Sequence, residues 1–65
     1  MTYTAAQLAK EAERELRYRQ FVYSRLILEG KLKPELAEQR IAMMDEIRER
    51  LQAQAEVEEE QGRLL

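Results

Sequence analysis

The sequence lacks the two residue types that most often cross-link a very small domain. It contains no cysteine and no histidine among its 65 residues, which excludes disulfides and zinc sites built from thiolate or imidazole ligands. A chain of this length buries too little surface for a comfortable margin of stability. Oligomerisation or a partner protein remains as the source of additional stability, and we expect a homodimer.

Residues that carry covalent or acid–base catalysis are also scarce. Besides three tyrosines, the only hydroxyl side chains are Thr2, Thr4 and Ser24, and no histidine is present to activate them as nucleophiles. The 13 acidic residues recur at the three- and four-residue spacings of a solvated helix face. Two glycines do not make a phosphate-binding loop. We therefore expect no enzymatic activity, no bound metal and no cofactor.

Long apolar runs and strong net charge are missing as well. No window approaches the roughly 20 apolar residues of a membrane span, and no secretion signal is visible, so we expect a cytoplasmic protein without membrane contact. At 45% hydrophobic residues and a net charge of −2, the chain is too apolar for a disordered polyelectrolyte. Residues 1–33 carry a net charge of +3 and residues 34–65 a net charge of −5, which favours packing of the two halves side by side.

Gly30 and Pro34 are the only strong helix breakers before the final residues, and they divide the chain into two predicted helices. Thr4 and Gln7 have the spacing of a capping box, so a first helix is predicted over about 5–29, closed by Gly30. Residues 30–33 form the predicted turn, and Pro34 suits the first position of a second helix over about 34–57. The tail, residues 58–65, gathers glutamates where the helix dipole favours cations, and we expect it to fray. The whole chain, 1–65, is then a single helical hairpin.

Apolar residues fall in one sector of each predicted helix at 100° per residue. These sectors contain Ala5, Leu8, Ala9, Ala12, Leu16, Tyr23, Leu26 and Ile27 in the first helix, and Ala37, Ile41, Met44, Ile47, Leu51 and Ala55 in the second. A short connection makes the two helices antiparallel neighbours. The predicted fold class is all-α, an antiparallel helical hairpin that pairs with a second copy as a four-helix homodimer.

A second face of the first helix combines apolar and basic side chains. Tyr18, Phe21 and Leu28 project away from the first sector and mix with arginines. Large aromatic residues and arginine are enriched in protein interfaces and among their hot spots. The candidate partner-binding residues are Arg14, Arg17, Tyr18, Phe21, Arg25 and Leu28. Three interpretations remain open: these residues pack against a second copy of the chain, they face a different target protein, or they are ordinary surface residues. The first two can hold at once, because dimerisation through one sector leaves another free.

Several segments together resemble a group of small phage and prophage proteins. The resemblance is carried by Glu15-Leu16-Arg17, Tyr23-Ser24-Arg25-Leu26, Gly30-Lys31-Leu32, Ala37 and Ile41-Ala42-Met43-Met44. That group usually has proline where this chain has Ser24. The resemblance implies a phage origin, and small phage proteins of this kind bind and disable host factors. A comparable two-helix phage protein is the anti-activator of a quorum-sensing LuxR-type regulator, which also inhibits a pilus assembly ATPase.

The leading functional hypothesis is a small protein-binding inhibitor or adaptor, phage-encoded, that disables a host protein such as a quorum-sensing transcription regulator or a pilus assembly ATPase. The alternative is a nucleic-acid accessory protein of a phage recombination or replication region. Its basis is a basic tract, comprising Lys10, Arg14, Arg17, Arg25, Lys31 and Lys33, with aromatic residues between. The acidic second half opposes phosphate contacts, so nucleic acid is the less favoured partner.

Overall fold

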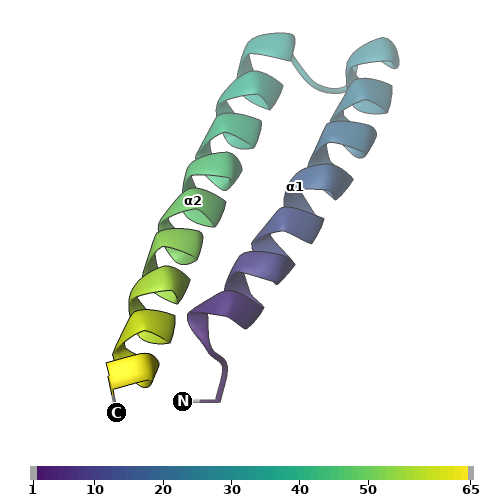
Figure 1. Ribbon diagram of the computed structural model, residues 1–65. Coiled ribbons are helices and arrows are strands. Elements are labelled where there is room, and N and C mark those ends of the chain that lie inside the picture. The colour runs from purple at the N-terminus through teal and green to yellow at the C-terminus, as the bar shows by residue number, and fades with distance from the viewer. Residues whose placement is uncertain (1, 65) are drawn as a thin grey trace.

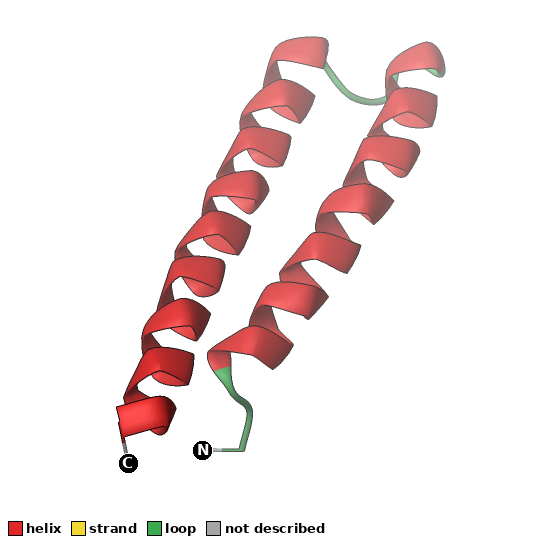
Figure 2. Cartoon of the chain, in the orientation of Figure 1, coloured by secondary structure: helices red, strands yellow, loops and turns green. Residues whose placement is uncertain are grey.

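Two antiparallel helices make up the protein. The computed structural model describes residues 2–64, in which α1 (Ala5–Leu28) and α2 (Pro34–Leu64) are joined by a short turn. The two helices lie side by side, and the start of α1 and the end of α2 lie at the same end of the molecule (Figure 1). The remaining described residues form the loops coloured green in Figure 2. The molecule measures 53 × 18 × 16 Å, and the predicted all-α hairpin is confirmed.

The first helix begins with the capping box that its sequence predicts. The Thr4 hydroxyl accepts a hydrogen bond from the Gln7 backbone N–H at 3.1 Å, and the Gln7 side-chain oxygen accepts one from the Thr4 N–H at 2.9 Å. These bonds satisfy backbone donors that have no partner within the helix. The start of α1 is therefore fixed by local sequence.

The turn closes α1 with a Schellman motif. The Lys31 N–H donates to the Leu26 carbonyl at 2.8 Å, and the Gly30 N–H donates to the Ile27 carbonyl at 3.0 Å. Gly30 has a φ of +72°, a left-handed conformation that glycine adopts without the strain of a Cβ atom. Pro34 then opens α2, as predicted, and the Lys33 carbonyl accepts from the Ala37 N–H.

The structure differs from the expected end of the second helix. The predicted helix ends near residue 57 and leaves 58–65 frayed, whereas α2 continues as helix to Leu64; Leu65 lies outside the described residues. Two contacts support the extension. Glu58 accepts a hydrogen bond from the Ala5 N–H of α1 at 3.2 Å, and Arg63 pairs with Glu59 at 2.9 Å. A carboxylate at the positive end of α1 is favourable, and this partner lies 53 residues away in the sequence.

The residues between the helices follow the spacing of a coiled coil, alternating steps of three and four. This contact seam consists of Ala5, Ala9, Ala12, Leu16, Arg19, Tyr23 and Leu26 in α1, and Ala37, Ile41, Met44, Arg48, Leu51 and Ala55 in α2, all of them buried or half-buried. Small side chains at the seam let two helix backbones approach closely.

Very little of the seam is completely shielded from solvent. Among residues 2–63, the only buried ones are four alanines, Ala5, Ala9, Ala12 and Ala37. Nine large hydrophobic side chains are exposed instead. One hairpin therefore leaves several large apolar side chains in contact with solvent.

Candidate protein-binding surfaces

The six candidate residues from the sequence lie on one stripe of α1. At 100° per residue, Arg14, Arg17, Tyr18, Phe21, Arg25 and Leu28 occupy a sector of about 100°, opposite the seam residues of the same helix. All six are exposed. Tyr18 is 62% exposed, Phe21 67% and Leu28 88%. We call this surface the outer face, since it points away from α2.

Two arginines of the outer face pair with glutamates of the same helix. The Arg14 Nε lies 3.6 Å from a Glu11 oxygen, and the Arg17 Nη1 lies 3.6 Å from a Glu13 oxygen. Both arginine side chains are at least two-thirds exposed. Ion pairs of this kind contribute only about 0–1 kcal/mol. A partner protein with carboxylates can therefore replace the glutamates at small cost.

A second apolar surface lies along one side of the hairpin, where both helices contribute to a shallow groove. We call this surface the groove face. Its lining combines the apolar side chains of Leu8, Ala12, Met44, Ile47 and Leu51 with the charged side chains of Glu11, Glu15 and Arg19. Leu36 and Met43 precede Ile47 by 11 and 4 residues and so extend the same stripe of α2. Leu36, Met43 and Ile47 are 38%, 58% and 47% exposed.

The groove face includes two residues that the sequence places between the helices. Leu8 is 42% exposed and Ile47 is 47% exposed, so neither belongs to the closed contact. In α2, Arg48 takes the seam position between Met44 and Leu51. A seam of two packed helices advances by 3.5 residues per turn, and steps of three and four from Ile41 reach Arg48 rather than Ile47.

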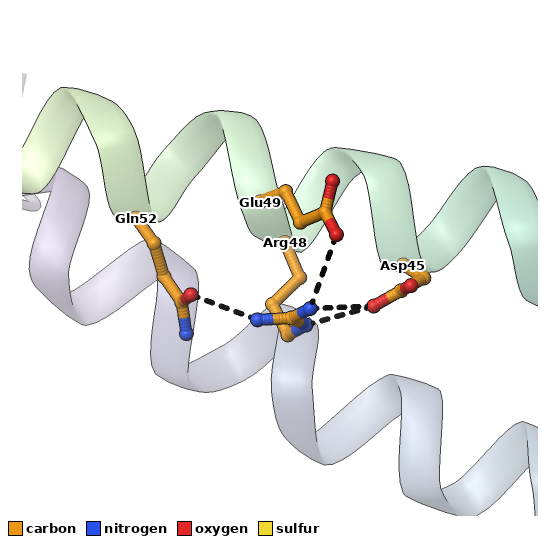
Figure 3. A network of polar contacts seen from close by, with 4 residues as sticks. All are labelled: Asp45, Arg48, Glu49 and Gln52. Carbon is orange, nitrogen blue, oxygen red and sulfur yellow. Dashed lines mark hydrogen bonds and ion pairs between the residues drawn. The ribbon is translucent and has the colours of Figure 1, made fainter.

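Arg48 is the centre of a polar cluster on the side of the hairpin opposite the groove face (Figure 3). Its Nη2 lies 2.6 Å from the Asp45 carboxylate and 3.8 Å from Glu49, and its Nη1 donates to Gln52 at 2.8 Å. The hydrogen bond to Asp45 is the main cause that raises the Arg48 pKa, and burial opposes it. Glu13 of α1 raises this pKa further. Sequence reasoning missed Arg48 because the sector of the second helix was assembled from its apolar residues, Ile47 among them.

The opposite side also has a hollow nearer the turn. Its apolar lining includes Leu16, Ile27 and Ile41, interrupted by Gln20, Glu38 and Asp45. These three large apolar residues are half-buried, because the two helices already cover much of their surface. The hollow therefore offers less uncovered apolar surface than the groove face.

Within residues 2–64, no cluster of acidic side chains has a geometry that could hold a metal ion. Over the same described residues, neither α1 nor α2 is long and apolar enough to cross a membrane.

Comparison with other proteins gives no relative on which to base a function. No protein-family model matches the chain, and no significant match was found among curated proteins or solved structures. The resemblance to small phage proteins thus stays a prediction from the sequence.

Proposed function

We propose that this chain is a non-enzymatic, homodimeric hairpin that binds another protein through the outer face of α1. The observation that carries the proposal is the exposure of Tyr18 and Phe21, which are 62% and 67% exposed. They lie on a stripe that also holds three arginines. Tyrosine and arginine are the residue types most enriched among interface hot spots, and phenylalanine is enriched in interfaces. Their position opposite α2 leaves them available to a partner.

The proposed partner is a host protein in the bacterial cytoplasm, which a phage-encoded inhibitor would disable. This part of the proposal rests on the resemblance of residues 15–48 to small phage proteins. A quorum-sensing transcription regulator of the LuxR type and a pilus assembly ATPase are the first targets to test. An acidic surface beside an apolar pocket on the target would complement the arginines and rings of the outer face.

The alternative partner, nucleic acid, would use the same basic stripe. Its support is weaker because Arg14 and Arg17 lie beside Glu11 and Glu13, whose carboxylates repel phosphate. Fluorescence anisotropy with labelled DNA at low salt distinguishes the two partners. Binding that weakens steeply with salt and disappears in an Arg14→Glu/Arg17→Glu variant would favour nucleic acid over protein.

Titration calorimetry with purified targets tests the protein-binding proposal directly. The double variant Tyr18→Ala/Phe21→Ala should bind at least about tenfold more weakly than the unchanged chain, because hot-spot truncations cost about 2 kcal/mol or more. Tyr3→Ala is the matched control, since Tyr3 is 61% exposed and lies outside α1. Equal affinity of all three proteins, with unchanged helicity in circular dichroism, would remove the outer face as the binding site.

A further inference from the structure

The lone hairpin exposes more surface than a protein of its mass normally does. Its accessible surface is 5549 Å², whereas a compact monomer of 7.7 kDa is expected to expose about 4,300 Å². The excess is about 1,200 Å² per chain. Covering that excess with a second copy would bury about 2,400 Å² in total, within the range of obligate homodimers.

We propose that the second copy covers the groove face and lies antiparallel to the first, so that the turn of each hairpin packs beside the open end of the other. The open end is the one that holds the start of α1 and the end of α2. This inference rests on the homodimer of the proposed function and assigns its interface and its orientation. The product is a four-helix bundle whose core is formed by the groove faces of both chains.

Exposure and chemistry select the groove face over the other surfaces. Leu8, Leu36, Met43 and Ile47 are all at least 38% exposed there, and both helices contribute, so the surface is wide enough for two further helices. The outer face comes from one helix alone and is interrupted by three arginines. The opposite side offers less uncovered apolar surface, because its large apolar residues Leu16, Ile27 and Ile41 are half-buried.

The distribution of charge selects the antiparallel orientation. Residues 25–40, around the turn, carry four basic and three acidic side chains, a net charge of +1. At the open end, residues 52–64 carry four glutamates and one arginine, a net charge of −3, while residues 2–14 are neutral. A parallel dimer would place the two acidic ends together, whereas the antiparallel dimer places each beside Lys31 and Lys33 of the other copy.

A distance measurement on the full chain tests the orientation. Because the sequence has no cysteine, Glu29→Cys provides a single labelling site at the exposed turn and leaves Lys31 and Lys33 in place. Double electron–electron resonance between the two spin labels should give a separation approaching the 53 Å length of the hairpin. A separation comparable with the 18 Å width would overturn the antiparallel arrangement.

Two matched substitutions to arginine test whether the groove face is the dimer interface. Ile47→Arg should weaken dimerisation by about 100-fold or more in sedimentation equilibrium, as expected for a charge placed in an apolar interface core. Ala53→Arg should leave the dimer intact, since Ala53 is exposed, does not line the groove and lies six residues after Ile47, on a different side of α2. Ile47→Arg dimers as tight as those of the unchanged chain would refute the groove-face interface.

The outcomes separate this inference from the proposed function. If the unchanged chain is a dimer and Ile47→Arg does not weaken that dimer, the assigned face is wrong. The dimer of the proposed function then stands. If the unchanged chain is a monomer, the inference and the proposed dimer are both wrong. Loss of dimerisation by Ile47→Arg together with a long label separation supports the inference, whichever target the outer face binds.

Discussion

The buried alanines between the helices allow us to predict how much stability is lost when one of them is enlarged. Ala9 is 5% exposed and lies in the seam between Ala5 and Ala12, so the larger side chain of Ala9→Leu has no space without moving α2. Overpacking of this kind typically costs about 1–3 kcal/mol. For a domain of this size, we expect the melting temperature to fall by roughly 4–24 °C.

The assay is thermal unfolding followed by circular dichroism, with all proteins at the same concentration because dimerisation makes stability depend on concentration. Ala53→Leu is the matched control, since Ala53 is an exposed alanine in the interior of α2. Its stability should change by less than about 0.5 kcal/mol. If Ala9→Leu melts at the same temperature as Ala53→Leu, the reasoning that close alanine contacts hold the helices together is refuted.

Three further predictions concern the ends of the helices and the response to pH. Glu58→Gln should lower stability by about 0.3–1 kcal/mol in urea unfolding, because the carboxylate at the start of α1 loses its charge; equal stability at low salt would argue against this contact. Gly30→Ala should cost about 1 kcal/mol in the same assay, because its φ of +72° strains a side chain with a Cβ atom, and a stabilised variant would contradict the Schellman turn. The melting temperature should stay constant between about pH 6 and pH 8, because no side chain titrates there at its ordinary pKa in a chain without histidine. The pKa of Arg48 is raised, so its stabilising contribution is complete below the unfolded-state value and is lost only at far higher pH. A marked change in melting temperature near neutrality would show a perturbed group that this account does not contain.

Local features of the hairpin were predictable because each depends on residues close in sequence. The Thr4 and Gln7 cap, the Gly30 turn and the Pro34 start need only a few neighbouring residues, and all are found in the structure. The stripe of Tyr18, Phe21 and the three arginines also followed from helical periodicity. Its exposure was predictable, whereas its role in binding stays a prediction.

Features that depend on how the two helices fit together were not predictable in the same way. At 100° per residue Arg48 lies within the sector of the α2 seam residues and Ile47 lies at its edge. The packing of the two helices then leaves the apolar Ile47 exposed and the charged Arg48 half-buried. The helical extension through Glu58 depends on a hydrogen bond to Ala5, a residue of the other helix. Neither the register nor this distant partner is contained in the local pattern of α2.

The most direct test of the central claim, that this hairpin works as a dimer and presents its outer face to a partner, is sedimentation equilibrium of the unchanged chain and of Phe21→Arg at micromolar concentrations. The account predicts that both proteins have twice the 7.7 kDa mass of one chain, because Phe21 lies outside the dimer interface. A monomeric mass for the unchanged chain would contradict the dimer. A dimer that dissociates on Phe21→Arg would show instead that the outer face is the dimer interface and is not free for a partner.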